Sequence, residues 1–534
     1  MMSAFEKPHV VLVPFPALGH AIPLLDFANS LASFGIDITC VTTSANVHRL
    51  QHQMDHDIRL LVLPTPVVEG LPEGMESFDQ VPTEQSGLIF DLVLKLEAPF
   101  NRWLEGQLVG KTVPPPVCIM HDVLLGWTME LPDKHNIARV VFNTYGAFAT
   151  TLLHSAWLSA SQNELEREGD SHLLSLELRT PLKLHKHEID PMLFHPVMMD
   201  VIGRLQSVKE GWGMLVNTFE QLEPEYLQHL TKLTGKKVWS IGPVLPPACF
   251  GGGVKSSARG KMADVSVEQL LQWLDSQSSC SVLYISFGSH TFLTKEQSKA
   301  LACGLEASEQ PFIWAVKVSP QIEPMTSNTA SDLCSTYLPE GFQERTKNRG
   351  LVIFGWVPQL VILSHASVGA FMSHCGWNSM LESTTLGVPF ITWPMHVDQH
   401  FNSNLAIKLG IGIQACEHGA GIPDKQRVMD AVTLVLRKEE GKQMKRDAEK
   451  LKGTARNAVA YGGSSQANLL DFVREIRKLE MAIKTAGCAG SSKAKRQDDL
   501  TSEIYKLGVS ETVCRFSPAI DCMRPRRKHT ERGG

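Results

Sequence analysis

The chain alternates short apolar runs with helix-like stretches, and it does so in two series that one Pro/Gly/Ser-rich segment separates. Such alternation is typical of buried parallel strands that are joined by crossover helices. The separating segment begins at Pro246-Pro247 and continues through Gly251-Gly-Gly253 to Ser256-Ser257, a composition suited to an interdomain linker. The sequence therefore predicts an α/β protein with two doubly wound parallel-sheet domains that face a cleft, and ligands prefer such clefts.

The first series predicts strands at His9–Pro14 and Ile36–Thr42, with a loop at Phe15–Ala21 and a helix at Pro23–Phe34 between them. The other predicted strands are Val117–Met120, Arg139–Phe142, Met214–Asn217, Ser281–Phe287, Phe312–Val316, Leu351–Phe354, Ala370–Met372 and Phe390–Trp393. In the second series, Lys295–Ser308 and Ser379–Thr385 are predicted to be helical.

Composition excludes several classes of protein. The chain has 534 residues, of which 43% are hydrophobic and 20% charged, and its formal net charge is −5. This balance suits a globular protein and gives no reason to expect nucleic acid or an anionic membrane as a partner. No secretory signal and no apolar stretch long enough to span a bilayer is evident. The 11 cysteines are dispersed without a C-x-x-C pair, which favours reduced thiols and a cytoplasmic protein.

The segment His374-Cys-Gly-Trp-Asn-Ser379 lies between a predicted strand and a predicted helix. Backbone N–H groups at the start of a helix, together with Asn and Ser side chains, make a natural phosphate site. Gly376 allows the backbone to approach a ligand closely. Asn378 or Ser379 could instead simply cap the helix, and the segment alone leaves the two interpretations even.

The residues around this segment favour a nucleotide sugar. Trp356 follows a predicted strand and offers a flat face on which a base can stack, although a core tryptophan is the common alternative. Pro358 and Gln359 place the indole at the edge of a loop, which favours exposure. Glu382 and the pair Asp398-Gln399 carry the carboxylate and amide groups that suit ribose and sugar hydroxyls.

A second pair of polar residues lies in the N-terminal half. His20 follows the first predicted strand, and Asp122 follows the strand at Val117–Met120, so both should emerge at the same edge of the sheet. A histidine that a carboxylate orients can accept a proton from a hydroxyl group. Separately, each residue is as well explained by capping a helix or a strand. The loop after the first strand lacks G-x-G-x-x-G, which disfavours a nicotinamide or flavin site.

Two short patterns resemble metal ligands. Asp55-His-Asp57 matches a D-x-D motif, and His185-Lys-His187-Glu188 is a cluster of ligand-type side chains. Neither has the paired spacing of a structural zinc site, and both lie in polar loops. Solvated loops are the favoured interpretation, and no metal is expected.

The segment Trp356–Gln399 resembles the signature box of plant secondary-product UDP-glycosyltransferases, the family 1 sugar transferases. The matching motifs of the box are W-x-P-Q at 356–359, H-C-G-W-N-S at 374–379, Glu382, G-V-P at 387–389 and Pro394 through Asp398-Gln399. Outside the box, the resemblance includes Gly19-His20, Asp122-x-x-x-Gly-Trp-Thr128, Asn217-Thr-Phe-Glu220, Gly242-Pro243, Ser286-Phe-Gly-Ser289 and Gly462-Gly-Ser-Ser465. It covers roughly residues 8–480. One departure is His396-Val397, where the family more usually has a pair such as Glu-Ala.

The resemblance implies a GT-B fold, in which two Rossmann-like domains face a cleft. It implies an acceptor-binding domain at 1–245, a linker at 246–266, a domain that binds the UDP-sugar at 267–463 and a helix at 464–480 that returns to the N-terminal domain. Residues 481–534 have no counterpart in the family, and their basic, aperiodic composition predicts a disordered tail. A monomer is expected.

The resemblance also implies roles for individual residues. Trp356 would stack on uracil, Gln359 would contact the donor and Glu382 would hold the ribose hydroxyls. His374, Asn378, Ser379 and Ser289 would face the diphosphate, and Trp377, Asp398, Gln399 and Thr144 would contact the sugar. Gln399 at the last position of the box is associated with glucose donors, so that UDP-glucose is the expected co-substrate and no separate cofactor is expected.

The implied reaction inverts the anomeric carbon and needs no metal. His20 would remove a proton from the hydroxyl of a small lipophilic acceptor, and Asp122 would stabilise the imidazolium, giving a β-O-glucoside. A flavonoid or other phenolic is the favoured acceptor, with a terpenoid, sterol or hormone as the alternative. A non-catalytic protein that only binds UDP-sugars is disfavoured because it need not retain both His20 and Asp122.

Overall fold

The computed structural model describes residues 7–54, 58–82, 85–109, 115–125, 135, 137–161, 166–168, 171–174, 182–185, 211–251, 254, 259–317, 330–416 and 421–489. The D-x-D pattern at 55–57, His187, Glu188, the motif residues 126–128 and the predicted tail beyond 489 lie outside the described residues.

The N-terminal half forms a seven-stranded parallel sheet with the strand order β10-β9-β5-β4-β1-β2-β3. Its strands are β1 His9–Val13, β2 Asp37–Thr43, β3 Arg59–Leu63, β4 Cys118–Asp122, β5 Ala138–Asn143, β9 Gly213–Val216 and β10 Lys237–Ser240. Its helices are α1 Leu18–Ser33, α2 Val47–Leu50, α3 Ser86–Lys95, α4 Glu97–Val109, α6 Ala147–Ser161 and α9 Pro224–Thr234.

Residues alternate between the two faces of this sheet, as they must in a strand. Val10 and Leu12 of β1 pack against α1, whereas Val11 and Val13 lie in the cluster that contains the apolar residues of α3, α4 and α6. Because both faces are covered, the strands read as continuous apolar runs in the sequence. A small antiparallel sheet of β6 (Glu166–Glu168), β7 (Ser171–Leu174) and β8 (Leu182–His185) was not predicted.

The C-terminal half forms a six-stranded parallel sheet with the strand order β13-β12-β11-β14-β15-β16. Its strands are β11 Val282–Ser286, β12 Phe312–Val316, β13 Gly350–Phe354, β14 Val368–Ser373, β15 Phe390–Thr392 and β16 Gly412–Gln414. Its helices are α10 Val267–Asp275, α11 Lys295–Ser308, α12 Ala330–Tyr337, α13 Phe342–Thr346, α14 Gln359–Ser364, α15 Trp377–Leu386, α16 Gln399–Lys408, α17 Lys425–Arg437 and α18 Glu439–Val459. Thr294 begins α11 with a capping box, since its side chain accepts from the Gln297 N–H while the Gln297 side chain accepts from the Thr294 N–H.

The strand order of the two sheets explains where the candidate residues lie. In the first sheet the strand order reverses at β1, whose neighbours are β2 and β4, and in the second it reverses at β11, whose neighbours are β12 and β14. Crevices beyond the carboxyl ends of strands at such switch points are the usual ligand sites of α/β proteins. His20 follows β1 and Asp122 ends β4, while Ser289 follows β11 and His374 follows β14.

The structure confirms the predicted strands to within a few residues and corrects one predicted loop. Helix α1 begins at Leu18, so that His20 lies in its first turns and not in a loop Phe15–Ala21. Pro23 lies inside α1 and has no N–H to donate to the carbonyl of Gly19, four residues earlier. The strands β3, β10 and β16, which lie at the edges of the sheets, were missed.

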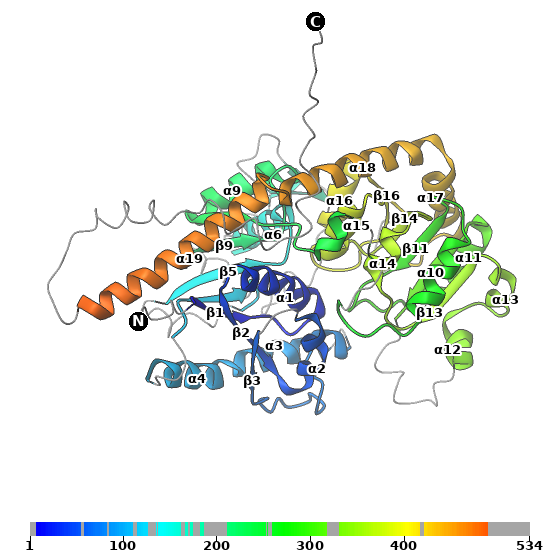
Figure 1. The fold of residues 1–534 in the computed structure, drawn as a ribbon. Helices are drawn as coiled ribbons and strands as arrows, with labels where there is room; N and C mark the ends of the chain where they lie inside the picture. The colour runs from blue at the N-terminus through cyan, green and yellow to red at the C-terminus, as the bar shows by residue number, and fades with distance from the viewer. Residues whose placement is uncertain are drawn as a thin grey trace, which may run out of the picture.

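The last helix of the described chain, α19, runs from Ser464 to Ala489, beyond the predicted end at residue 480. Figure 1 shows α19 in orange, returning from the C-terminal half along the N-terminal sheet. Its buried residues Phe472, Val473 and Ile476 join the apolar cluster on the α1 face of that sheet. The Phe472 ring lies 5.3 Å from that of Trp239 in β10, and Asp471 accepts a hydrogen bond of 2.7 Å from the indole of Trp239. In the described residues, no helix is both long and apolar enough to cross a bilayer.

We expect Phe472→Ala to destabilise the N-terminal half by about 3–5 kcal/mol, because the substitution leaves a cavity among buried aromatic rings. Urea unfolding of the full chain measures the effect. Lys478→Ala on the same helix is the control, since Lys478 is exposed and its change should stay within about 0.5 kcal/mol. Equal effects of the two substitutions would show that the buried face of α19 does not hold the N-terminal sheet.

Candidate active site between the two sheets

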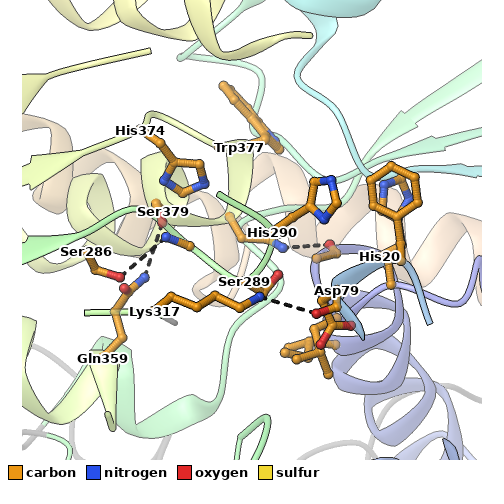
Figure 2. Close-up of a pocket in the computed structure, with 18 of the residues that line it drawn as sticks. His20, Asp79, Ser286, Ser289, His290, Lys317, Gln359, His374, Trp377 and Ser379 are labelled. Atoms are coloured by element: carbon orange, nitrogen blue, oxygen red, sulfur yellow. Dashed lines mark hydrogen bonds between the residues drawn. The ribbon is translucent and has the colours of Figure 1, made fainter. Parts of the chain in front are cut away.

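A cavity of about 710 Å³ lies between the two halves of the chain. Every predicted site residue except Asp122 lines it: His20, Thr144, Ser289, Trp356, Gln359, His374, Trp377, Asn378, Ser379, Glu382, Asp398 and Gln399. Figure 2 shows His20 on one side of this space and Ser289, His374 and Gln359 on the other. The structure therefore brings together residues from the two halves that are far apart in sequence.

His20 and Asp122 form a buried pair on the N-terminal side. The Nδ1 atom of His20 lies 2.8 Å from Oδ2 of Asp122, whose side chain is fully buried, whereas 15% of the His20 side chain is exposed. Asp122 also accepts a hydrogen bond from the backbone N–H of Leu124. Because an ionised carboxylate only accepts hydrogen bonds, Nδ1 carries the proton and Nε2 is left bare. The Thr144 hydroxyl lies 3.0 Å from the same Nδ1 atom.

His374 faces the cavity from the end of β14 as a neutral imidazole. Burial lowers the pKa of His374 to about 3, with His396 as a smaller cause. Two glycines make room for its ring, since a Cβ at Gly288 or at Gly376 would lie 2.5 or 2.6 Å from Nε2. Gly288 also has φ +78°, a conformation that favours glycine. His374 can therefore donate a hydrogen bond but brings no positive charge at neutral pH.

The first residues of α15 line the cavity, and no side chain caps the N-terminus of this helix. Gly376 is the N-cap residue, and neither Asn378 nor Ser379 caps the helix. The capping interpretation is therefore wrong for both residues. The Asn378 amide donates instead to the carbonyl of Gly19 at 2.6 Å, which Pro23 leaves without a helical partner. Ser379 accepts from the Gln359 amide at 3.2 Å.

Trp356, Gln359 and Glu382 lie together at one end of the cavity. The Gln359 amide donates to Oε2 of Glu382 at 2.7 Å, and its oxygen accepts from the hydroxyl of Tyr284 at 3.0 Å. Trp356 is half-buried and lines the cavity, so it is not the core tryptophan of the alternative interpretation. Its backbone N–H and C=O both bond to Asp264, through the carboxylate and the N–H of that residue.

Trp377, Asp398 and Gln399 are largely held by protein contacts. The Trp377 indole is buried and donates to the carbonyl of Asn217 in the other half at 2.7 Å. The Gln399 side-chain oxygen accepts from the N–H groups of Met395 and His396. Asp398 accepts from Asn402 at 2.7 Å, and burial raises the pKa of Asp398 to about 6.

The chain matches two family models. The model described as "UDP-glucoronosyl and UDP-glucosyl transferase" matches residues 190–446, and that described as "Glycosyltransferase, N-terminal domain" matches residues 6–246. Among curated proteins, scopoletin glucosyltransferase from Nicotiana tabacum is 33% identical over 487 residues, covering 88% of this chain and 98% of that protein. Flavonol 3-O-glucosyltransferase UGT89B1 from Arabidopsis thaliana is 33% identical over 491 residues, covering 89% and 97%.

The chain belongs to the UDP-glycosyltransferase family of plants. Among solved structures, it is similar to Glycyrrhiza uralensis UGT73P12 complexed with glycyrrhetinic acid 3-O-monoglucuronide, with a TM-score of 0.77 and 29% identity. The match covers 91% of this chain and 99% of that one. The similarity and the two facing parallel sheets confirm the predicted GT-B fold.

Several polar residues of this UDP-glycosyltransferase line the cavity but were not singled out from the sequence. They are Asp79, Arg259, Lys261, Asp264, His290 and Lys317. Lys317 directly follows β12, and His290 directly follows Ser289, so the ends of adjacent strands were a usable signal for both. The cluster around Asp79 is different, because it is assembled from distant segments: Arg49 and Lys261 pair with the Asp79 carboxylate and Lys317 donates to its backbone carbonyl. The charges of the three cations lower the pKa of Asp79. No spacing in the sequence reveals it.

The described part of the chain contains no group of three or more His, Cys, Asp or Glu side chains that could hold a metal ion.

We expect Asp398→Asn to stabilise the protein at pH 7.5, by about 2–3 kcal/mol, because ionising the buried carboxyl is costly. The folded pKa is raised, so the stability contributed by neutral Asp398 is complete below about pH 4 and is lost as the pH rises through about 6. Asparagine keeps the neutral form at every pH. Thermal unfolding of both proteins should show a gain at pH 7.5 that disappears near pH 4. A gain independent of pH would contradict the assignment.

Proposed function

We propose that the enzyme transfers glucose from UDP-glucose to a hydroxyl of a small lipophilic acceptor, inverting the anomeric carbon to give a β-O-glucoside. The observation that carries this proposal is the position of the His20–Asp122 pair, which faces the N-terminus of α15 across one cavity. The domain division at 246–266, with the acceptor on the N-terminal side and the donor on the C-terminal side, belongs to the same proposal.

His20 acts as the general base in this proposal. Asp122 and Thr144 hold its Nδ1 side, so that Nε2 is the atom that takes the proton of the acceptor hydroxyl. The carboxylate then stabilises the imidazolium, while the acceptor oxygen attacks the anomeric carbon on the face opposite to UDP. Thr144 touches the base, which gives this residue a role in orienting His20 in addition to the sugar contact expected from the sequence.

The donor contacts follow the positions of the C-terminal residues. Trp356 stacks on uracil, and Glu382 and Gln359 bind the ribose hydroxyls. Two further sets of residues bind the diphosphate and the sugar. The free N–H groups at the start of α15 and the neutral His374 donate to the diphosphate, where negative charge grows as UDP leaves. His374, Asn378, Ser379 and Ser289 form the diphosphate set, and Trp377, Asp398 and Gln399 form the sugar set.

A flavonoid or other phenolic is the proposed acceptor. The cavity beside His20 is lined by Phe15, Phe78, Phe90, Leu124 and Tyr145, which suit a flat apolar molecule. The names of the tobacco and Arabidopsis relatives support this class. A terpenoid is the second candidate, because the similar Glycyrrhiza uralensis structure holds glycyrrhetinic acid 3-O-monoglucuronide.

The proposal includes that the enzyme is a monomer in the cytosol. The eight described cysteines are all free, which supports a reducing compartment.

We expect His20→Ala to lower the rate of glucosyl transfer by about 10²–10⁴-fold, the usual contribution of a general base, while UDP binding stays nearly intact. Product formation read by mass spectrometry and UDP affinity read by calorimetry separate the two effects. His48→Ala is the matched control, since His48 is exposed on α2 and does not line the cavity. Transfer at the rate of the unchanged enzyme in His20→Ala would show that another group is the base.

The enzyme incubated with UDP-glucose, UDP-galactose or UDP-glucuronate and a mixed panel of phenolics and terpenoids should add one hexose to a phenolic, most rapidly from UDP-glucose. The favoured donor follows from Gln399, and the favoured acceptor follows from the aromatic lining of the cavity. Mass spectrometry of the products identifies both. Addition to terpenoids alone would move the assignment to the second candidate, and no addition to any acceptor would favour a protein that only binds UDP-sugars.

A further inference from the structure

One arginine of the linker joins the two halves of the enzyme inside the cavity. The Nε atom of Arg259 donates to Oδ2 of Asp26 in α1 at 2.7 Å, and its NH1 atom donates to Oε1 of Glu382 in α15. All three side chains are nearly buried, with exposures of 10% for Arg259, 11% for Asp26 and 5% for Glu382. The second oxygen of Glu382 is held by Gln359 at 2.7 Å.

The backbone next to Arg259 is fixed in place. Gly260 has φ +81° and packs so closely on the indole of Trp356 that a Cβ there would lie 2.4 Å from a ring carbon. A little further along the linker, Asp264 bonds to both backbone groups of Trp356. The linker segment 259–264 therefore connects Trp356 and Glu382, the two residues assigned above to uracil and ribose.

Two carboxylates share this one guanidinium. Glu382 and Asp26 are nearly buried, and both bond to Arg259, so without it two negative charges would lie close together with little water around them. Among the described residues, Tyr284 of β11 and Cys249 of the linker are titratable groups that interact with these carboxylates. Burial raises the pKa of Tyr284 well above its usual value and that of Cys249 to about 12, so both are neutral. Arg259 is the cation that these carboxylates share.

We propose that Arg259 is a positioning residue for the donor: it keeps Glu382 ionised and aimed at the ribose hydroxyls, with Asp26 as the second anchor of the guanidinium. The inference rests on the proposed function, because Glu382 is assigned to ribose there. An ionised carboxylate accepts from both ribose hydroxyls, whereas a protonated one must use one oxygen as a donor.

The consequence is a pH dependence that appears only without Arg259. In Arg259→Gln, the nearly buried carboxylates of Glu382 and Asp26 lose their shared cation and repel each other, which penalises the ionised acceptor form of Glu382, increasingly so as the pH falls. A residue that merely braces the domains would affect stability but would not move the pH profile of donor binding. Asp26→Asn added to Arg259→Gln should move the pH profile of donor binding part of the way back to that of the unchanged enzyme, since the negative charge of Asp26 is removed.

The experiment measures the affinity for UDP-glucose without acceptor, by calorimetry between pH 5.5 and 8.5. UDP-glucose is preferred to UDP, because a terminal phosphate itself titrates near pH 6. Arg259→Gln should bind about tenfold more weakly at pH 7.5, the effect of one lost charged hydrogen-bond partner, and should lose further affinity toward pH 5.5 relative to the unchanged enzyme. Burial raises the pKa of Asp398 to about 6, within the same pH range, so each variant's profile is compared with that of the unchanged enzyme.

Three further variants sharpen the result. Arg259→Lys keeps the charge and should restore most of the pH profile, and Arg259→Gln combined with Asp26→Asn should show a smaller acid-side loss than Arg259→Gln alone. Arg345→Gln is the matched control, because Arg345 is an exposed arginine that pairs with Glu306 away from the cavity. It should bind UDP-glucose as the unchanged enzyme does. Circular dichroism establishes that each variant is folded.

The outcomes separate this inference from the proposed function. If Glu382→Ala binds UDP-glucose normally, the assignment of ribose to Glu382 is wrong. If Glu382→Ala binds weakly while Arg259→Gln binds as tightly as the unchanged enzyme, or more tightly, only the role of Arg259 is overturned. Weaker binding by Arg259→Gln with an unchanged pH profile would also overturn it, since that result describes a brace between domains.

Discussion

The geometry of the active site depends on one backbone carbonyl, that of Gly19. Pro23 has no N–H, so this carbonyl lacks its partner within α1 and accepts the amide of Asn378 from the other half of the chain at 2.6 Å. The bond joins the residue next to His20 to the first turn of α15. The position of the proposed base relative to the proposed diphosphate site is therefore set directly, and the indole of Trp377, bonded to the carbonyl of Asn217, adds a second link of the same kind.

Several ionisable side chains of this cavity are neutral or paired with a partner of the protein. His374 is neutral because it is buried, Asp398 has a pKa raised to about 6, and Asp122 is held against His20. A diphosphate placed among neutral donors and the N-terminus of α15 meets partial positive charges, which act strongly where water is excluded. Arg259, a nearly buried cation that lines the cavity, is already bound to Asp26 and Glu382. Its contribution to donor binding is thus indirect.

Local patterns predicted the α/β class and the central strands, because buried parallel strands are continuous apolar runs with clear boundaries. The GT-B fold was predicted from the resemblance of the motifs to those of the UDP-glycosyltransferases. Edge strands such as β10 (Lys237–Ser240) were missed, since a short run with a polar start has no distinctive pattern. The predicted loop at Phe15–Ala21 was wrong for His20, because α1 begins at Leu18, five residues before the predicted start at Pro23. The grouping of the candidate residues around one cavity agrees with the sequence, whereas the raised pKa of Asp398 and the partners of Arg259 depend on tertiary contacts that no spacing encodes.

The segment proposed as the interdomain linker contributes more contacts to this site than its composition suggests. A Pro/Gly/Ser-rich segment is usually a spacer whose length sets the reach between domains. Here its glycine serves a different purpose, because Gly260 at φ +81° lets the backbone lie directly on the Trp356 indole. The adjacent Arg259 bonds to a carboxylate on each side of the cleft. A segment proposed to link the two domains in sequence thereby also couples the proposed nucleotide end of the donor site to the helix that carries the proposed base.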